Sequence, residues 1–537
     1  MNITKISTLP YDSQKPGTGG LRAKTQAFME PNYLENFLQS VVNVWKAKGM
    51  AFDTFVVAGD GRYPGVEFLP KIIKLLAANG IKKIMVVGRD LVTVTPAVSH
   101  IIRKYGASGG FMLSASHNPG GVDGDFGIKT EMSNGGGAPE NFTIPLWEET
   151  KRISEYLTLD ITDEEALRLP MVEYVDAVKD YADLMESMFD FELIKKWFAA
   201  GHTFCFDAMY ASTGPIAREI FVKRLGAPEC SIVRGEPKPD FGGLHPEPNP
   251  YYNPEIVKFM IEEKGADVGV ACDGDGDRNM ILGKGILVYP PDSLAIMTKY
   301  HRLIPYYKNG LKGVARSIPT SSAVDMVAQK LGVKCYKTPT GWKYFSSLLD
   351  AGMISLCGEE SFGQGGDYIR EKDAIFAILY WLNILAATGK TIEELMRELW
   401  EENGRVFYSQ YSYESVDKAK AEALVEYIKA ADISGKEFGG VLIKSKDDLS
   451  YVDPATGEAA SDVGVEMFTS NGMRVFFRLS GTGTVGATLR LYVEKYEGDK
   501  SKLGMDLREY MREAYILVDD IFKIGEYFPD AEKTIAI

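Results

Sequence analysis

The stretch TPAVSHIIRKYGASGGFMLSAS (95–116) sets the fold class. Apolar residues recur at helical spacing up to Gly106, and a short apolar strand follows that ends in a loop of small and polar residues. The same order of helix, closing glycine, strand and loop returns in TGPIAREIFVKRLGAPECSIVRGE (213–236) and SSAVDMVAQKLGVKCYKTPTGW (321–342). The closing glycines are 120 and 106 residues apart, which predicts three α/β units of about domain size.

Further strand-like runs end in glycine-rich or acidic loops. Such sharp strand exits are where α/β sheets present ligands, although topology alone names no function. The runs are FVVAGDGR (55–62), FCFDAMY (204–210), VGVACDGD (268–275) and ISLCGEES (354–361).

The last third of the chain predicts a separate domain. MRVFFRLS (473–480) and TLRLYVE (488–494) alternate as the strands of a hairpin do, with helical segments around 417–432 and 500–517. A chain of 537 residues is also too long for one core. We therefore predict an α/β protein with three α/β domains that contain mixed sheets, followed by a C-terminal α+β domain. The predicted domains are 1–170, 171–300, 301–400 and 401–537.

The composition is that of a soluble globular protein. Hydrophobic residues make up 45% of the chain and charged residues 25%, and the formal net charge of −14 disfavours nucleic acid as a partner. The five cysteines are widely spaced and form no C-x-x-C pair, which indicates reduced thiols in a cytoplasmic protein. The N-terminus lacks a basic-then-apolar signal. The longest apolar run, 374–387, is too short to span a membrane and is typical of a buried helix between Asp373 and Gly389.

The stretch ACDGDGDRNM (271–280) places three aspartates at alternate positions, separated by glycines. It begins like a calcium loop, but Arg278 stands where the tight turn needs glycine and Lys284 where a glutamate is required. Three carboxylates that fold inward suit a hard cation such as magnesium. The alternative is a solvated acidic turn. The predicted ligands are Asp273, Asp275 and Asp277.

The loop SASHNPGG (114–121) leaves Ser116 at the exit of a strand, where its hydroxyl is exposed and held. The adjacent His117 is poorly placed as its base, because neighbouring side chains of an extended segment diverge. No G-x-S-x-G elbow is present, so a hydrolase triad fits poorly. The alternative is a structural turn.

A third loop, CGEESFGQGGDYIREKD (357–373), offers Glu359 and Ser361 as acceptor and donor for sugar hydroxyls. Arg370 and Lys372 follow, just before the apolar helix. A lysine there either has a lowered pKa and transfers protons or is an ordinary snorkelling lysine, and the loop alone leaves both open.

The fourth loop, RLSGTGTVGATLR (478–490), contains GTGTVG, which matches the dinucleotide fingerprint as written. That fingerprint must open a helix, whereas ATLRLYVE alternates as a strand. Backbone N–H groups, hydroxyls and two arginines remain, which predicts a nest for a phosphate monoester. The nest is Arg478, Ser480, Gly481, Thr482, Gly483, Thr484 and Arg490. The segments KPGTGGLRAK (15–24) and PTGWK (339–343) add further basic residues.

Taken together, these loops resemble the α-D-phosphohexomutase superfamily, and more closely its phosphoglucomutase branch of the eukaryotic type. The resemblance runs from KPGTGGLR to TLRLYVE, nearly the whole chain. It implies four domains in a heart shape around one central cleft, the first three α/β and the fourth of a different fold.

The resemblance also implies roles for individual residues. Ser116 carries a phosphoryl group, and one Mg²⁺ lies on the three aspartates and an oxygen of phospho-Ser116. Lys372 is the general acid or base, and Arg22, His117 and Lys129 lie close to the phosphoserine. Substrate contacts are implied for Arg278 beside the metal loop, for Thr340, Gly341 and Lys343, for Glu359, Ser361 and Arg370, and for the C-terminal nest at the distal phosphate.

The implied activity is that of an isomerase. Phospho-Ser116 donates to glucose 1-phosphate, the resulting glucose 1,6-bisphosphate turns over, and its other phosphate returns to Ser116 to leave glucose 6-phosphate. Closure of the fourth domain would keep water out. The expected partners are hexose phosphates, with no nucleic acid and no membrane, and the chain is a monomer or dimer.

Three positions depart from the family pattern, and four alternatives remain. Ser114 replaces threonine, Gly19 replaces serine, and Tyr368 stands where relatives often have histidine, which removes any histidine role there. The first alternative is a phosphomannomutase or dual-specificity mutase, although GEESFG is like glucose-type enzymes and mannose-tolerant relatives more often carry GEMSG. Phosphoglucosamine mutase fits less well. The others are a magnesium-dependent phosphatase and a catalytically silent scaffold.

Overall fold

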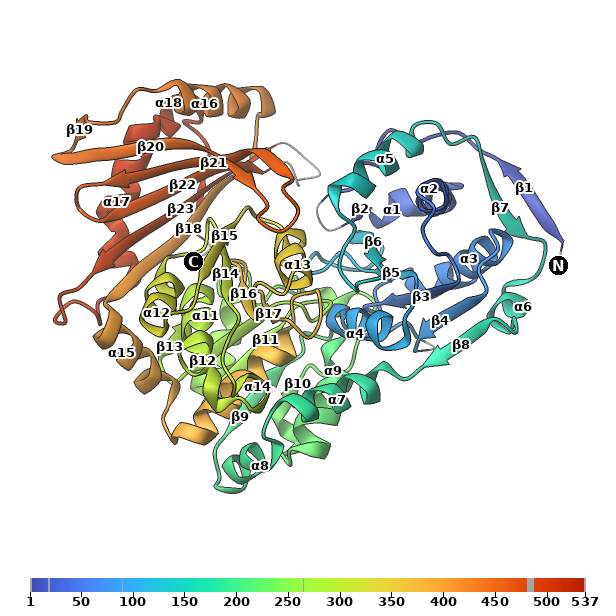
Figure 1. Ribbon diagram of the computed structural model, residues 1–537, viewed down its shortest axis with the longest axis horizontal. Helices are drawn as coiled ribbons and strands as arrows, with labels where there is room; N and C mark the ends of the chain where they lie inside the picture. Colours follow the sequence, from blue (N-terminus) through green and yellow to red (C-terminus); the bar gives the residue numbers. More distant parts are fainter. Residues whose placement is uncertain (1, 18–19, 89, 264, 481–486, 536–537) are drawn as a thin grey trace.

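The computed structural model describes residues 2–17, 20–88, 90–263, 265–480 and 487–535. Four large sheets take their strands from consecutive stretches of chain, namely 21–175, 204–288, 314–366 and 405–535. The first and fourth domains form two lobes above the second and third, which gives a heart-shaped outline (Figure 1). The predicted four-domain α/β architecture is therefore confirmed, while the boundaries at 170, 300 and 400 stay predictions.

The first domain is a mixed six-stranded sheet of order β2-β6-β5-β3-β4-β8. Alternate residues of β3 face opposite layers, since Phe55 and Val57 pack with α2 and α3 while Val56 and Ala58 pack with α4. A separate pair, β1 (Ile3–Ser7) and β7 (Glu155–Leu159), is antiparallel. The strands are β2 (Leu21–Lys24), β3 (Thr54–Gly59), β4 (Lys83–Val87), β5 (Gly109–Leu113), β6 (Asp125–Met132) and β8 (Val172–Val175), and the helices are α1 (Thr25–Phe28), α2 (Tyr33–Ala47), α3 (Gly65–Ala78), α4 (Thr95–Tyr105), α5 (Glu140–Thr150) and α6 (Asp163–Leu167).

The second and third domains repeat this plan with sheets of order β10-β9-β11-β12-β13 and β15-β14-β16-β17. The second contains β9 (Phe204–Asp207), β10 (Ile232–Val233), β11 (Val268–Cys272), β12 (Asn279–Gly283), β13 (Ile286–Val288), α7 (Ala177–Met188), α8 (Phe191–Ala199), α9 (Thr213–Ala217), which continues as a π-helix (Arg218–Arg224), and α10 (Pro254–Val257). The third contains β14 (Val314–Ser317), β15 (Cys335–Thr338), β16 (Leu356–Gly358), β17 (Gln364–Gly366), α11 (Pro290–Lys299), α12 (Ala323–Leu331), α13 (Trp342–Asp350), α14 (Ala374–Thr388) and α15 (Ile392–Asn403).

Strand pairing corrects the predicted internal repeat. Each of the three sheets has a central strand (β3, β9, β14) with parallel neighbours on both sides, and one neighbour (β5, β11, β16) then pairs with an antiparallel strand. In this scheme the helix–glycine–strand units at 213–236 and 321–342 are equivalent, but their counterpart in the first domain is α3–β4, not the unit at 95–116. The pattern of helix, glycine and strand occurs twice in each domain, so the sequence alone did not show which of the two copies in the first domain corresponds to the later units.

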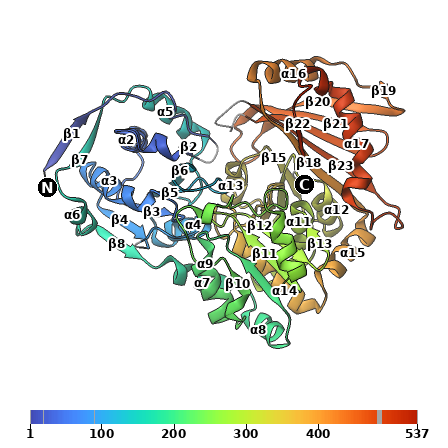
Figure 2. The same ribbon diagram turned by 180° about the vertical axis from the view of Figure 1, so that it is seen from behind.

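The fourth domain is one antiparallel seven-stranded sheet of order β19-β20-β21-β22-β23-β18-β24. The predicted hairpin of 473–480 and 488–494 is confirmed, since β22 and β23 pair antiparallel over eight registered positions. Helix α17 lies on the side of this sheet away from the first domain (Figure 2). The elements are β18 (Arg405–Val416), β19 (Glu437–Phe438), β20 (Val441–Val452), β21 (Ala459–Thr469), β22 (Met473–Ser480), β23 (Ala487–Glu497), β24 (Lys533–Ile535), α16 (Lys418–Ala430), α17 (Leu507–Phe522) and α18 (Ile524–Tyr527).

The last long helix begins later than the predicted 500–517. Asp499 binds the backbone N–H and hydroxyl of Ser501 and so forms a turn, and the helix starts only after Asp506, whose side chain accepts from the N–H of Glu509.

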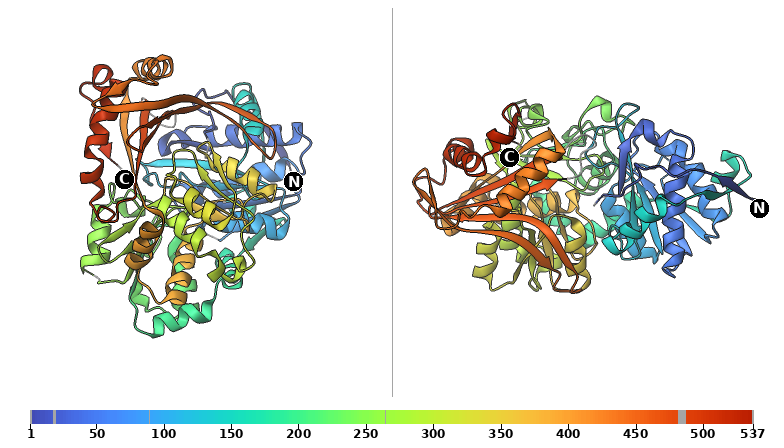
Figure 3. Two further views of the ribbon diagram at one scale, coloured as in Figure 1. Left: turned by 60° about the vertical axis from the view of Figure 1, so that its left-hand side comes forward. Right: turned by 90° about the horizontal axis from the view of Figure 1, so that it is seen from above.

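The first and fourth domains lie at opposite ends of the long axis (Figure 3, right).

Helix α14 is the buried helix predicted from 374–387. Asp373 caps its start by accepting the N–H of Phe376, and Gly389 ends it in the left-handed conformation. Within the described ranges, no single helix has the length and apolar content to cross a bilayer, although α14 and α15 pass that test as a pair bent by 86°. No disulfide joins any two of the five cysteines, all of which are described.

Candidate active site

Three of the four predicted loops leave their sheets at the same structural position. Ser116 follows β5, Asp273 follows β11 and Glu359 follows β16, and these are the equivalent strands of the first three domains. Each loop leads into the antiparallel strand that closes its unit, β6, β12 or β17. The repeated topology therefore directs one loop from each domain toward a shared centre.

Ser116 is buried at this centre with its hydroxyl directed at the acidic loop. Its Oγ donates to Oδ2 of Asp273 at 2.9 Å, and its backbone N–H donates to Oγ of Ser114 at 2.8 Å. The same Ser114 hydroxyl donates to Oδ2 of Asp275 at 3.0 Å. Ser114 stands where the family pattern has threonine, and it makes a contact that either hydroxyl side chain can make. The prediction of an exposed hydroxyl is wrong for Ser116, whose exposed fraction is 1%.

The three aspartates form one buried cluster, with an oxygen of each within 4.8 Å of the others. Among the described residues, Oδ1 of Asp275 and Oδ1 of Asp277 are buried without a hydrogen-bond partner. Burial and the two neighbouring carboxylates raise the pKa of Asp273 well above its ordinary value. Unpartnered, mutually repelling carboxylate oxygens fit a hard cation, whereas a solvated turn does not fit their burial.

Backbone geometry explains the glycines of this loop. Oδ1 of Asp273 accepts the N–H groups of Asp277 and Arg278 at 2.9 and 3.0 Å, which closes a tight turn. Gly276 has φ +70, and a Cβ there would lie 2.5 Å from Val94 of the first domain. Only glycine fits there without displacing the neighbouring domain.

Cations surround the cluster. Lys129 Nζ lies 2.6 Å from Oδ2 of Asp275 and 3.5 Å from Oδ2 of Asp277. Burial opposes both charges, but the ammonium holds the pKa of Asp275 well below its usual range and the carboxylates raise that of Lys129. Arg22 lies near enough to interact electrostatically with Asp275 and Asp277, and its buried Nε is unpartnered among the described residues.

Lys372 bridges the metal loop and the sugar loop. Its Nζ lies 3.4 Å from Oδ2 of Asp277 and 3.2 Å from Oε1 of Glu359, and Glu359 also accepts the hydroxyl of Ser361 at 2.7 Å. Of the two sequence interpretations, a lowered pKa is wrong, because these carboxylates outweigh burial and raise the pKa of Lys372. The lysine rests protonated at this site.

His117 lies beside residues that the sequence analysis did not single out. Its ring stacks on His245 with centroids 6.1 Å apart, and its Nε2 lies 3.7 Å from Oε2 of Glu247. Glu247 also accepts Nη1 of Arg278 at 3.0 Å. Burial, with Arg278 and Arg22 nearby, lowers the pKa of His117 well below its ordinary value. The run HPEPNP (245–250) was the available signal, since its alternating prolines mark a rigid turn that presents a histidine and a glutamate.

Two predicted substrate contacts find other partners. The Arg370 guanidinium binds Asp350 at 2.5 Å and donates to three carbonyls at 349, 367 and 369. Lys343 forms an ion pair with Glu140 of α5, which joins the third domain to the first. Substrate binding by Arg370, Lys343, Thr340 and Gly341 stays a prediction.

The predicted phosphate nest is only partly visible. Gly481, Thr482, Gly483 and Thr484 lie outside the described residues, as does the side chain of Ser480 and the departure at Gly19. Arg478 and Arg490 are directly opposed on β22 and β23, and Nε of Arg478 donates to the hydroxyl of Tyr492 at 3.1 Å. Two adjacent guanidinium groups on one sheet face are suited to binding an anion.

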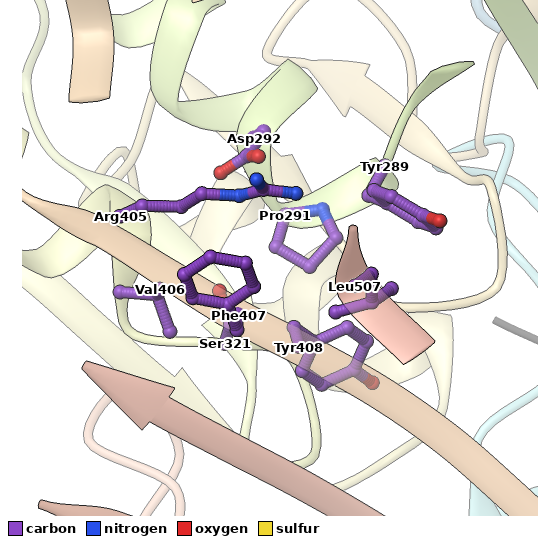
Figure 4. A pocket seen from close by; sticks show the side chains of 9 residues that line it. All are labelled: Tyr289, Pro291, Asp292, Ser321, Arg405, Val406, Phe407, Tyr408 and Leu507. Atoms are coloured by element: carbon purple, nitrogen blue, oxygen red, sulfur yellow. The ribbon is translucent and has the colours of Figure 1, made fainter. Parts of the chain in front are cut away.

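A separate cavity of about 10 Å³ lies where the third domain joins the fourth (Figure 4). That volume is about enough for one water molecule. Arg405 and Asp292 point toward one another across it, and none of the described residues that line it is a predicted site residue. The lining residues are Tyr289, Pro291, Asp292, Ser321, Arg405, Val406, Phe407, Tyr408 and Leu507.

Comparisons with known families cover nearly the whole chain. The alpha/beta/alpha domains I, II and III of phosphoglucomutase/phosphomannomutase match residues 13–157, 173–285 and 290–403. The C-terminal domain of phosphoglucomutase-1 matches residues 405–532.

Individual relatives agree over their full length. The chain is 45% identical over 542 residues to a phosphoglucomutase of Rhizobium radiobacter, which covers 99% of both chains. It is 44% identical to a probable cytoplasmic phosphoglucomutase of Arabidopsis thaliana, again over 99% of each. Among solved structures, the open form of the Paramecium exocytosis-sensitive phosphoprotein pp63/parafusin, a phosphoglucomutase, superposes with a TM-score of 0.89. That pair is 41% identical, over 98% of this chain and 97% of the other.

Proposed function

The chain belongs to the phosphoglucomutase/phosphomannomutase family, and from that premise we propose that it interconverts glucose 1-phosphate and glucose 6-phosphate through a phosphoserine at Ser116 and a glucose 1,6-bisphosphate intermediate. One observation carries the proposal. The Ser116 hydroxyl lies 2.9 Å from a buried three-aspartate cluster, and Lys372 links that cluster to the sugar loop. A phosphoryl acceptor, a cation site and a proton donor thus share one centre.

The cation is proposed to be Mg²⁺ on Asp273, Asp275 and Asp277, joined by an oxygen of the group on Ser116. When bound it supplies positive charge against the transferring phosphoryl group. The chain's own Arg22 and Lys129 add to that neutralisation, since Lys129 pairs with Asp275 and Arg22 interacts electrostatically with Asp275 and Asp277.

One half-reaction returns a phosphoryl group from the bisphosphate to Ser116. The bond between phosphorus and the sugar oxygen breaks and the bond to Oγ of Ser116 forms. The Ser116 hydroxyl loses its proton to Asp273, which already accepts its hydrogen bond, and the Lys372 ammonium donates a proton to the departing sugar oxygen. In the other half-reaction both transfers run in reverse. In each half-reaction one hydroxyl thus loses a proton and the other gains one, while Asp273 and Lys372 change protonation in opposite directions.

Water must be excluded, or phospho-Ser116 would hydrolyse. We attribute this to closure of the fourth domain, which carries the arginines of the predicted nest. The structure of the Paramecium relative is an open form, which supports more than one domain arrangement in the family. X-ray scattering that detects no compaction with glucose 1,6-bisphosphate would contradict closure.

Glucose phosphates are favoured over mannose phosphates as substrates. The chain carries GEESFG (358–363), and the full-length relatives are named phosphoglucomutases. Coupled assays with glucose 1-phosphate and mannose 1-phosphate separate this proposal from a dual-specificity mutase. Rapid phosphate release from glucose 6-phosphate would instead indicate the phosphatase. Localisation stays a prediction, because relatives are named both cytoplasmic and chloroplastic.

Substitution of the serine tests the mechanism. Ser116→Ala is expected to abolish turnover of glucose 1-phosphate and to remove the phosphorylated species from the intact mass spectrum. A Ser116→Ala protein that keeps its rate refutes the phosphoserine mechanism. A wild-type protein that does not turn over glucose 1-phosphate supports the silent scaffold.

A further inference from the structure

Arg62, in the loop after β3, is a fully buried arginine outside all the predicted site loops. Its Nη2 donates to the backbone carbonyl of Ser116 at 2.6 Å, and its Nη1 donates to the carbonyls of Asp125 and Asn118 at 2.9 and 3.3 Å. Its Nε binds both carboxylate oxygens of Asp60 at 2.8 and 3.0 Å. One guanidinium therefore holds the serine loop at two points and ties it to the start of β6.

The backbone at Ser116 needs such a restraint. Its φ is +53, a left-handed conformation that residues with a side chain adopt only where the surroundings enforce it. The metal loop packs against the same carbonyl, since a Cβ at Gly274 would lie 2.4 Å from that oxygen and 3.3 Å from Nη2 of Arg62. The Ser116 carbonyl is thus held by both the Arg62 guanidinium and the loop of the aspartates.

We propose that Arg62 is a positioning residue for phosphoryl transfer, which fixes the Ser116 carbonyl and so aims Oγ of Ser116 at Asp273. This rests on the proposed function, because it concerns the same serine. The hydroxyl direction follows from the backbone, since the left-handed turn and the carbonyl contact leave Oγ 2.9 Å from Oδ2 of Asp273. Arginine is required because its planar fork reaches three carbonyls and a carboxylate at once, which a lysine ammonium cannot do.

A merely structural arginine makes a different prediction, and the chain offers a matched control. Arg316 in β14 is equally buried, donates through Nη1 to the carbonyls of Ser317, Ile318 and Thr320, and binds Asp325 through Nε and Nη2. All of these hydrogen-bond partners of the Arg316 guanidinium belong to the third domain. Arg62→Lys and Arg316→Lys therefore remove the same kind of buried fork at two places.

The experiment compares kcat and KM for glucose 1-phosphate at a temperature where circular dichroism shows both variants folded. Misplacement of a reacting group by about 1 Å costs roughly 100-fold in rate. Arg62→Lys is expected to lose about that in kcat with KM nearly unchanged, because the sugar loop is untouched, while Arg316→Lys keeps its kcat. Intact mass measured over time is expected to show that glucose 1,6-bisphosphate phosphorylates Ser116 of Arg62→Lys more slowly than wild type, by the same factor as the loss in kcat.

Four results would overturn the inference. An Arg62→Lys protein as active as Arg316→Lys refutes it alone, and so does a rise in KM without a fall in kcat. Wild-type protein that does not turn over glucose 1-phosphate refutes the proposed function and this inference together. Should Arg62→Lys not fold, Asp60→Asn loosens the same guanidinium through Nε and is expected to lower kcat selectively, whereas an unchanged kcat in Asp60→Asn refutes the inference.

Discussion

Asp292, in the cavity between the third and fourth domains, is expected to destabilise the protein at neutral pH, so Asp292→Asn should stabilise it. The carboxyl is 5% exposed, and its described hydrogen bond is a long one from Nε1 of Trp400 at 3.3 Å. Burial raises its pKa to about 6 although Arg405 opposes this, and burial likewise lowers the pKa of Arg405 although Asp292 opposes that. Both partners therefore lose more from burial than they gain from one another.

The pKa gives the sign and size of the effect. Because the folded-state pKa is above the unfolded value, the stabilising contribution of protonated Asp292 is complete below about pH 4 and is lost as the pH rises through about 6. Each unit of pKa difference corresponds to about 1.4 kcal/mol, so ionised Asp292 lowers the free energy of unfolding by up to about 3 kcal/mol at pH 7. Arg405 keeps its stacking on Trp400 and Phe407 in the variant, with Cζ 4.1 and 4.0 Å from the two ring centroids.

Native-state hydrogen exchange measures this free energy without assuming that a four-domain chain unfolds in one step. Peptides from 290–299 and 405–416 are expected to exchange more slowly in Asp292→Asn than in wild type at pH 7, with little difference near pH 4. The matched control is Asp325→Asn. There the pairing with Arg316 outweighs burial and lowers the pKa of Asp325, so this variant should lose stability at pH 7. Faster exchange in Asp292→Asn at pH 7, or a difference independent of pH, would refute the reasoning.

Three further expectations follow from the buried groups. Chelation should inactivate the enzyme until Mg²⁺ is restored. In scanning calorimetry, chelation should lower the Tm of phosphorylated wild type more than that of Ser116→Ala, and an equal fall in both would contradict this. Tyr368→Phe removes the hydroxyl that donates to Asp373 at 2.6 Å and should cost about 1–2 kcal/mol of stability in denaturant unfolding with kcat unchanged, so a large loss of kcat would show a role beyond capping. Burial and Glu371 raise the pKa of Glu131 well above its ordinary value. Glu131→Gln should therefore match wild type in stability at acid pH and exceed it increasingly as the pH rises through that raised pKa, and the opposite trend in Tm would be decisive against it.

Local chemistry made part of the site predictable. The aspartate run and the serine loop use residue types and spacings that few structural roles require, and the caps Asp373 and Gly389 bound α14 within a single stretch of chain. These signals are local, so they survive without knowledge of which strands pair.

Contacts between distant segments were not predictable. Arg62 reaches Ser116 across 54 residues and Glu247 reaches Arg278 across 31, and nothing in either local sequence names the partner. The direction of the Lys372 pKa shift was open because it depends on two folded contacts. The metal loop brings Asp277 to 3.4 Å from Nζ, and the folding of the third loop brings Glu359 to 3.2 Å. The equivalence of α3–β4 with the later units likewise required the strand order.

The charges of the assembled centre support the proposal that a metal and a phosphoserine belong together. Apart from the mutually balanced pair of Arg62 and Asp60, five carboxyl groups and four cations meet around Ser116. With all five carboxyl groups ionised, the sum is about one negative charge. A phosphoryl group adds up to about two negative charges, too many for a buried site, and a divalent cation offsets them almost fully. With both present the sum returns to its starting value, so we expect phospho-Ser116 to be stable here only beside the proposed cation. A chain with a net charge of −14 thus binds anionic substrates through a local balance that its overall composition does not reveal. The carboxylates are Asp273, Asp275, Asp277, Glu247 and Glu359, and the cations are Arg22, Lys129, Arg278 and Lys372.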